Sequence, residues 1–207
     1  MIRGMKGTSS QNPRKAALTE ALLRIVAERG LDQVSVREVA SAAGVSIGTV
    51  QYYFPTKDEM LTAAFAEVVR RVRTRLASVE YGGDVRSNLS TVLRELLPLD
   101  VRRTEEARIM LAFATRATTS PALADIQRSV LAEIHGALSE AFARAMNDRA
   151  SAAEAKRAAH LAIAAADGLA LHAVSAPGWI SRRQLAAALE LLLERLLPET
   201  AEPIGQT

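Results

Sequence analysis

The chain has 207 residues, which is enough for one small and one mid-sized domain, and its formal net charge is +3. The absence of cysteine excludes a disulfide framework and a thiolate zinc site, and it favours a reducing compartment, the cytoplasm. No signal peptide and no membrane span are expected, because the first residues hold no apolar core and no run of about 18 uncharged apolar residues follows.

Positive charge is concentrated near the N-terminus. Up to Lys57 the sequence has eight bases and four acids, a balance of +4, so the remaining residues carry −1 in total. The net charge alone is too small to argue for nucleic acid, but its distribution places the positive field in the first quarter of the chain.

Apolar residues recur at helical spacing almost throughout, and no stretch alternates with period two for long enough to predict a strand, so the expected fold class is all-α. Helix starts are marked by capping boxes and by proline at the first helical position. The boxes are Ser35 with Glu38, Thr56 with Glu59, Ser151 with Glu154 and Ser181 with Gln184, and the prolines are Pro13 and Pro121. These signals predict about nine helices, over residues 13–29, 36–43, 47–53, 57–79, 85–97, 101–118, 121–147, 152–175 and 182–197.

Residues 36–53 predict two short helices joined by a tight turn. Gly44 supplies the positive φ that such a turn needs, and Ser46 caps the second helix. A small apolar set holds the two helices near a right angle, and the first predicted helix closes it. The opposite surface of the second helix keeps two tyrosines and an amide largely free of packing, which favours a partner. This pattern is a helix-turn-helix.

A family resemblance is carried by VSVREVA at 34–40 and GVSIGTVQYYFPTKDEML at 44–61. These stretches resemble the DNA-binding signature of the TetR family of bacterial regulators, and the detailed match covers residues 13–65. In the C-terminal part, LLPLD at 96–100 and DGLALH at 167–172 are similar to the ligand-binding half of the BetI-like branch, whose name-giving members respond to choline. The resemblance implies a homodimeric, ligand-responsive regulator, a repressor that a small-molecule effector releases from an inverted-repeat operator.

Carried over by position, the resemblance makes residues 47–53 the recognition helix, which enters the major groove of double-stranded DNA. Thr49, Tyr53 and Lys57 correspond to phosphate contacts, and Gln51 to a base contact in which the amide pairs with N7 and N6 of adenine. Tyr52 serves either the core and groove wall or the DNA, and Phe54 is assigned to the core. The predicted DNA-binding set is Ser46, Ile47, Gly48, Thr49, Gln51, Tyr52, Tyr53, Lys57 and Arg37.

The family folds helices 101–118, 121–147 and 152–175 around an effector, for which an apolar or amphiphilic molecule is expected and a cationic one is left open. Asp167 is a charge within an Ala-rich apolar helix, so it either pairs internally or binds a cationic effector. No histidine stands four residues from another or beside a cysteine, so neither a metal site nor a cofactor is predicted. The candidate ligand-binding residues, most of which can equally be core, are Met110, Phe113, Phe142, Met146, Asp167, His172 and Trp179.

The last two predicted helices carry more apolar surface than one chain obviously needs. Alanines form a smooth ridge along 152–175, and leucines recur at 4, 3, 4 spacing along 182–197. A two-fold four-helix interface with a second copy would bury this surface, and the alternative is that both helices are internal to a monomer. The predicted interface residues are Ala162, Ala166, Ala173, Leu185, Leu189, Leu192 and Leu196.

Three regions follow along the chain: a helix-turn-helix DNA-binding domain at 1–57 with residues 1–11 disordered, a helical effector-binding and dimerisation domain at 58–197, and a disordered tail at 198–207. Two other functions were weighed. A helical enzyme is disfavoured because no nucleophile elbow, phosphate loop, carboxylate pair or metal constellation is present. A nonspecific DNA-organising protein would not need some 130 residues of mostly uncharged helical domain.

Overall fold

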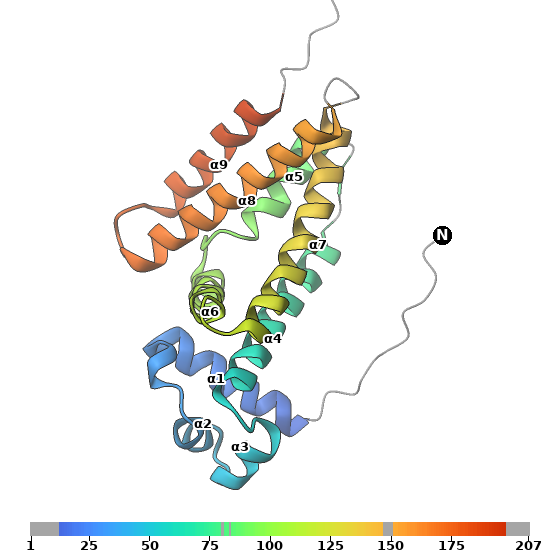
Figure 1. Ribbon diagram of the computed structural model, residues 1–207. Helices are drawn as coiled ribbons and strands as arrows, with labels where there is room; N and C mark the ends of the chain where they lie inside the picture. Colours follow the sequence, from blue (N-terminus) through green and yellow to red (C-terminus); the bar gives the residue numbers. More distant parts are fainter. Residues whose placement is uncertain (1–12, 80, 83, 147–150, 198–207) are drawn as a thin grey trace, which may run out of the picture. The chain divides into compact units, whose positions relative to one another are not determined.

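The structure, a computed structural model, describes residues 13–79, 81–82, 84–146 and 151–197 (Figure 1). The segments 1–11 and 198–207, which were predicted to be disordered, lie outside the described residues. Within the described part the chain forms nine α-helices and one short 3₁₀ helix, η1, and no strand. The all-α fold class is confirmed.

The helices follow the predicted order closely. Four predicted ranges, 13–29, 36–43, 47–53 and 152–175, agree residue for residue, and the other five helices end one to three residues early. At the ends of α4, α5 and α6, tighter turns with hydrogen bonds between residues three apart follow the last α-helical turn. The elements are α1 (Pro13–Arg29), η1 (Leu31–Gln33), α2 (Val36–Ala43), α3 (Ile47–Tyr53), α4 (Lys57–Ala77), α5 (Val85–Arg94), α6 (Val101–Ala117), α7 (Pro121–Ala145), α8 (Ala152–Ser175) and α9 (Arg182–Leu196).

Side-chain caps account for several helix starts. The predicted capping boxes at Ser151 and Ser181 are complete, with both reciprocal hydrogen bonds present. Ser35 and Thr56 accept a hydrogen bond from the third residue of their helices, at 3.1 Å in each case, but their boxes are not closed. The box at Ser35 stays open because the carboxylate of Glu38 instead accepts a hydrogen bond from the guanidinium of Arg29, in α1, at 2.7 Å.

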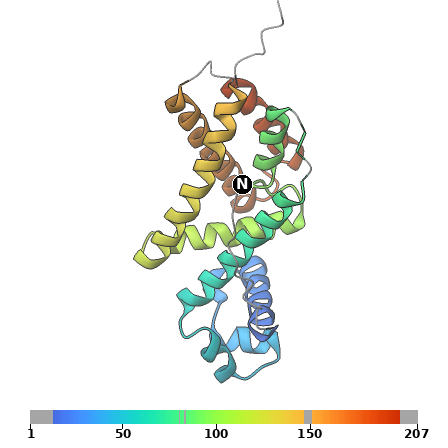
Figure 2. The ribbon, with the colours of Figure 1, turned by 90° about the vertical axis from the view of Figure 1, so that its right-hand side faces the viewer.

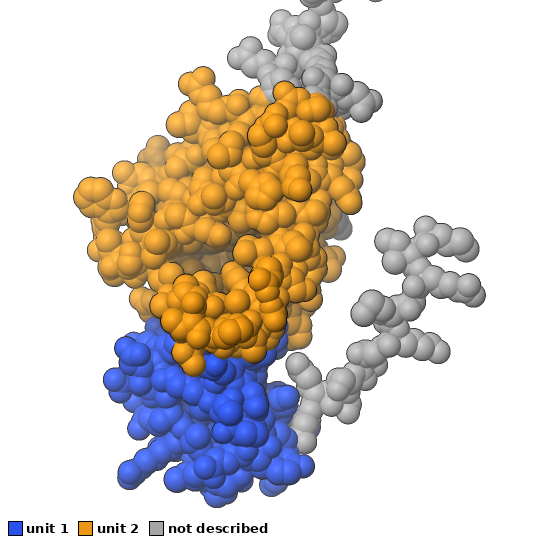
Figure 3. Space-filling model, viewed as in Figure 1, with its two compact units in different colours: residues 1–67 blue, residues 68–207 orange. Residues whose placement is uncertain are grey.

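The chain divides into two compact units, residues 1–67 and 68–207, which we call the N-terminal and the C-terminal unit (Figure 3). The domain boundary was expected at 57/58, at the start of α4. The division lies ten residues later, at 67/68, because the first turns of α4 bury Met60, Leu61, Ala64 and Phe65 and belong to the N-terminal unit. Helix α4 is thus shared between the two units.

The core of the N-terminal unit is built where α1 packs on α2 and α2 on α3 (Figure 1). Leu18, Leu22 and Ile25 of α1 meet Val39 of α2 and Val50 of α3, and each of these side chains is at most 2% exposed. Full burial of one such side chain contributes about 1.5–3 kcal/mol, so these few residues fix the three short helices relative to one another.

The core of the C-terminal unit lies between α5, α7, α8 and α9 (Figure 2). Helix α8 contributes small residues, which let α7 and α9 approach closely. This helix is the one described helix long and apolar enough to cross a membrane, but core helices share that composition, and its six buried residues all belong to the core cluster. They are Ala155, Ala158, Ala159, Ala162, Ile163 and Ala166.

A partly buried ion-pair network fastens the C-terminal end of α4 to α6. Arg75 donates from both terminal nitrogens to Glu106, at 2.9 and 2.7 Å, and from Nε to Glu95 at 2.6 Å. Arg103 binds the other oxygen of Glu95 at 3.1 Å. The carboxylate of Glu106 is only 6% exposed, and its hydrogen bonds with Arg75 raise the pKa of that guanidinium. The network keeps a buried carboxylate paired.

Candidate nucleic-acid interface

A left-handed glycine makes the turn between α2 and α3. Gly44 has φ 65° and ψ 36°, as the sequence predicted. Its N–H donates to Ser41 O at 3.3 Å, and the next N–H, of Val45, donates to Ala40 O at 3.0 Å. An L side chain is strained at this φ, so glycine is what allows the chain to turn here.

Ser46 starts α3 and buried Val50 fixes its rotation. The hydroxyl of Ser46 accepts the N–H of Thr49 at 3.1 Å and lies 2.9 Å from the hydroxyl of that residue. Val50 is fully buried, and α3 packs against α2. With one side of this seven-residue helix held in the core, the residues on its other side must face outward.

Arginines of α1 hold α2 in place. Arg24 donates to a carbonyl of the last turn of α2 at 3.2 Å, and Arg29 pairs with Glu38 at 2.7 Å. Nearby, Nζ of Lys15 lies 5.8 Å from the ring centre of Phe54, which is buried as predicted. At least three of the six described bases up to Lys57 are therefore engaged within the unit, so the charge count of +4 overstates how many are free for a partner.

The outward face of α3 is polar and aromatic. Tyr52 is 80% exposed, so a core role is excluded for it, and its ring meets the ring of Tyr53 edge to face at 5.0 Å between centroids. Gln51 is exposed, and its side-chain amide has no hydrogen bond within the described part of the chain. Of the nine predicted DNA-binding residues, Thr49 and Tyr53 are half-buried and the other seven are exposed.

Gly48 lies in the first turn of α3, and nothing inside the chain requires a glycine there. A Cβ at this position would have one neighbour within 4 Å, the hydroxyl oxygen of Ser46 at 3.8 Å, which is an ordinary van der Waals distance. Glycine in a helix is less stable than alanine by roughly 0.5–1 kcal/mol. Its presence on the exposed side of α3 therefore favours close approach by another molecule.

Lys57 and Arg37 supply uncommitted positive charge. Lys57 is exposed at the first position of α4, and neither it nor the exposed Arg37 is ion-paired within the residues described. A lysine at a helix start is disfavoured by the helix dipole, whereas a phosphate is favoured there by the free N–H groups. The same first turn also carries Asp58 and Glu59, so Lys57 is the one basic residue that it offers to an anion.

The predicted effector residues differ in burial within the C-terminal unit. Phe113, Phe142 and Met146 are at most 5% exposed, so their side chains fill the core, the alternative left open for them. Met110 is half-buried, whereas Asp167, His172 and Trp179 are exposed. Trp179 lies in the turn between α8 and α9, where Gly178 has φ 85°.

Asp167 is accessible to solvent, yet the surrounding protein desolvates its carboxylate and raises its pKa. The two observations together describe a group in a recess, which water reaches although protein atoms displace much of the bulk solvent. No hydrogen bond or ion pair engages Asp167 within the described residues. Internal pairing, one of its two predicted roles, is therefore not found there.

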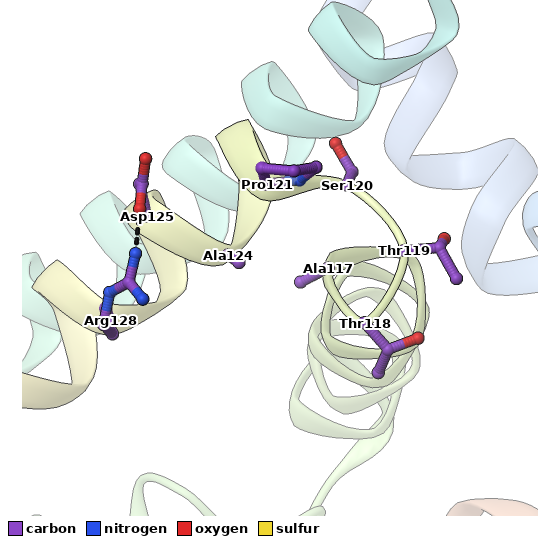
Figure 4. A pocket seen from close by; sticks show the side chains of 8 residues that line it. All are labelled: Ala117, Thr118, Thr119, Ser120, Pro121, Ala124, Asp125 and Arg128. Atoms are coloured by element: carbon purple, nitrogen blue, oxygen red, sulfur yellow. Dashed lines mark hydrogen bonds and ion pairs between the residues drawn. The ribbon is translucent and has the colours of Figure 1, made fainter.

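A hollow of about 410 Å³ lies where α6 meets α7 (Figure 4). Asp125 and Arg128 on its α7 side pair with each other, and none of the predicted effector residues lines it. This hollow could not be predicted from a motif, because a helix junction of small and hydroxyl residues has no chemical signature. Its lining residues are Ala117, Thr118, Thr119, Ser120, Pro121, Ala124, Asp125 and Arg128.

The predicted dimer-interface residues need correction. The side chains of Ala162, Ala166, Leu185 and Leu189 are at most 1% exposed in a single chain, where they pack in the core with α5 and α7. The other three, Ala173, Leu192 and Leu196, are half-buried against the same core. Most of the ridge on α8 and of the leucine stripe on α9 therefore packs against the core of the single chain.

A different apolar surface remains uncovered on the same two helices. Leu161 and Leu171 of α8 are 57% and 41% exposed, Leu191 of α9 is 53% exposed, and Trp179 between the helices is 77% exposed. We call these four residues the outer α8–α9 set. Half of the eight large apolar side chains that stand exposed among the described residues belong to it, which is unusual for surface in contact with water.

Comparison with known proteins agrees with this geometry. Residues 18–64 match the family described as bacterial regulatory proteins, tetR family, and residues 85–198 match the family described as BetI-type transcriptional repressor, C-terminal. The regulator BetI of Burkholderia cenocepacia is 32% identical over 183 residues, covering 86% of this chain and 89% of that protein. The regulator PksA of Bacillus subtilis is 26% identical, covering 90% and 91%.

Solved structures give the same result. A transcriptional regulator from Rhodococcus sp. Rha1 has a TM-score of 0.81 and 42% identity, covering 88% of this chain and 95% of that one. A protein from Saccharomonospora viridis solved in complex with choline has a TM-score of 0.78 at 21% identity, covering 90% and 98%, and so shows the fold. The chain therefore belongs to the TetR family, whose members are DNA-binding transcriptional regulators with a helix-turn-helix and not enzymes.

Proposed function

We propose that this protein is a dimeric repressor of the cytoplasm, which binds an inverted-repeat operator and is released from it by a small-molecule effector. The observation that carries the proposal is the outward face of α3, where an amide, an aromatic pair and a glycine stand exposed on a helix whose rotation buried Val50 fixes. A helix presented in this way can enter the major groove with its N-terminal residues against base edges.

The two kinds of DNA contact fall to different residues. Lys57, at the helix start, binds a phosphate and adds affinity without regard to sequence. Gln51, whose amide has no partner within the described residues, reads one base step. Removal of the lysine therefore weakens all DNA binding, whereas removal of the glutamine weakens discrimination.

Dimerisation is proposed to bury the outer α8–α9 set against its counterpart in a second copy. A two-fold axis places the same patch on both sides of the contact, so apolar side chains meet apolar side chains. The two recognition helices then reach half-sites about 34–36 Å apart, one turn of duplex, or a multiple of that distance.

The effector is proposed to bind in the C-terminal unit, whose drawn face is hollowed (Figure 3). Asp167 is the group that would select a cation, because its desolvated carboxylate has no partner within the described residues. A cation beside it offsets the cost of ionisation, so its affinity should fall as the pH drops through the raised pKa of this carboxyl. An apolar or amphiphilic effector would instead bind without regard to Asp167.

The DNA immediately upstream of the coding sequence is first searched for an inverted repeat. Operator binding is then measured on a duplex that contains this repeat and on a control duplex in which both half-sites are scrambled. The wild type should prefer the intact repeat. Gln51→Ala should lose about 1–3 kcal/mol of discrimination at one base step, with little change on scrambled DNA. Gln33→Ala removes an exposed amide of the same unit outside α3 and should change neither affinity. Equal binding to both duplexes would instead indicate a nonspecific DNA-organising protein.

Effector response is tested with choline and with its uncharged isostere 3,3-dimethylbutan-1-ol. For a cationic effector, choline should raise the melting temperature and lower operator affinity, and Asp167→Asn should abolish both effects while Asp32→Asn, in the other unit, retains them. By linkage the operator must reduce choline affinity by the same factor, typically 1–3 kcal/mol. A ligand that stabilises the protein but leaves operator affinity unchanged at saturation contradicts the sensor role.

A further inference from the structure

Two of the three histidines of the chain meet between α7 and α8. The ring centroids of His135, on α7, and His160, on α8, are 4.1 Å apart, and the ring planes are inclined by 35°. His160 has its Nδ1 within 2.9 Å of the carbonyl of Lys156, one turn earlier on α8. The Nδ1 of His135 is buried and has no hydrogen-bond partner within the part of the chain described.

The charged groups that act on His135 are both cationic when protonated. They are the His160 ring and the ammonium group of Lys156, and both lie on α8. The acids on the neighbouring turns of α7 are engaged elsewhere, Glu133 with Arg73 of α4 and Glu140 with a base of its own helix. No carboxylate acts on His135 within the described residues.

Among the described residues, no acid of the helices packed around this pair acts on His135. The bases of α5 pair with acids of α9, Arg86 with Glu194 and Arg94 with Glu190. On the α6 side, Glu106 is held by the arginine of α4. A proton added to His135 therefore meets a buried nitrogen without an acceptor and neighbours of its own sign.

The pair lies in the most extensive contact between helices of the chain, the one between α7 and α8 (Figures 1 and 2). We propose that the His135–His160 pair makes this contact proton-sensitive, so that acidification below neutral pH loosens α7 from α8. The device is independent of the proposed repressor function, because it needs neither operator nor effector.

Protonation of His135 would loosen this contact through two physical effects. A protonated Nδ1 without an acceptor is a buried, unsatisfied donor, and a second cation at the distance of stacked rings adds repulsion. Burial, followed by His160 and Lys156, accordingly lowers the pKa of His135 in the folded chain. The unfolded chain keeps the ordinary histidine pKa of about 6.5.

The direction of the pH dependence follows from this difference. As the pH falls below about 6.5, the unfolded chain takes up a proton that the folded chain resists, so the free energy of unfolding decreases. The decrease continues until the pH has passed through the pKa of folded His135 and then levels off. For each pH unit by which the folded pKa of His135 lies below the unfolded value, full acidification shifts the unfolding equilibrium tenfold toward the open or unfolded state.

The experiment uses the full-length protein and compares His135→Leu with His172→Gln, which alters the third, exposed histidine of α8. Melting temperatures are measured between pH 7.5 and pH 5. The wild type and His172→Gln should lose stability in parallel on acidification, and His135→Leu should lose less. In the same range, hydrogen exchange corrected for its intrinsic pH dependence should rise in α7 and α8 peptides and not in α1 peptides.

A titration of the three histidine C2 protons by NMR gives a reading that does not depend on a core substitution. His135 should titrate below the ordinary histidine pKa of about 6.5, and His160→Asn, which removes the neighbouring ring, should move the His135 midpoint upward. The proposal is overturned if His135 titrates at or above that ordinary value. It is equally overturned if His135→Leu keeps the full pH dependence of the wild type.

Discussion

Substitution of Gly48 by alanine should stabilise the protein and at the same time weaken its binding to DNA. The stabilisation comes from helix propensity, because Gly48 lies in α3, does not have a positive φ, and would place a Cβ 3.8 Å from its one neighbour, the hydroxyl of Ser46. No atom of the chain has to move. The loss of DNA affinity comes from the exposed side of the same helix, where the added methyl group keeps the duplex at a distance.

The size of the stabilisation can be set in advance. Alanine is favoured over glycine in a helix by roughly 0.5–1 kcal/mol, which in a chain of 207 residues corresponds to about 1–4 °C in melting temperature. Gly136 of α7 gives the matched control, because it is exposed, helical, and has no atom within 4 Å of a built Cβ. Gly136→Ala should stabilise by a similar amount and leave DNA affinity unchanged.

The assay is thermal unfolding together with fluorescence anisotropy of a labelled operator duplex, for the wild type and both variants. A steric loss at Gly48 should exceed tenfold in operator affinity, which is about 1.4 kcal/mol. The reasoning is refuted if Gly48→Ala binds the operator as tightly as Gly136→Ala does. A lower melting temperature for Gly48→Ala would show instead that glycine is needed within the chain.

Further outcomes are expected from single substitutions. Lys57→Ala should weaken binding to every duplex and flatten the salt dependence of the binding constant by about 0.9 log unit per log unit of salt, whereas the control Lys156→Ala should do neither. A change in sequence preference alone would contradict the phosphate contact. Arg75→Ala should lower the free energy of unfolding by about 3–5 kcal/mol, because it leaves the carboxylate of Glu106 buried and unpaired. Denaturant unfolding measures this loss, and a value below about 1 kcal/mol would show that the network is dispensable. Leu191→Glu should leave the melting temperature of the folded chain nearly unchanged but give monomers in sedimentation, and an unaltered dimer would exclude this surface as the interface.

Helix boundaries could be predicted wherever a local side chain sets them. Ser46, Ser151 and Ser181 cap the helix that follows them, and capping requires only residues three positions apart. The turn at Gly44 is equally local. The outward face of α3 could be predicted from this cap and this turn, because in a seven-residue helix that buries one valine the opposite side must face solvent.

The surface that we propose for dimerisation could not be predicted in the same way. Leu189 and Leu191 are both apolar residues of α9, but they point in opposite directions around the helix, and the structure buries the first and exposes the second. Periodicity reveals a stripe and does not say which of two apolar faces the chain itself covers. The candidate effector residues stay a prediction for a related reason, because Phe113 and Phe142 have the composition of a pocket wall and of a core alike.

The completeness of the C-terminal core within one chain bears on how gene expression would respond to the amount of this protein. Since Ala162 and Leu189 are already buried within a single chain, the surface that we propose for dimerisation is separate from the residues that fill this core. In a regulator that binds its operator as a dimer, the dimer concentration then rises with the square of the subunit concentration while monomers predominate. Promoter occupancy would therefore change more steeply than protein level, and newly made subunits could exchange into existing dimers.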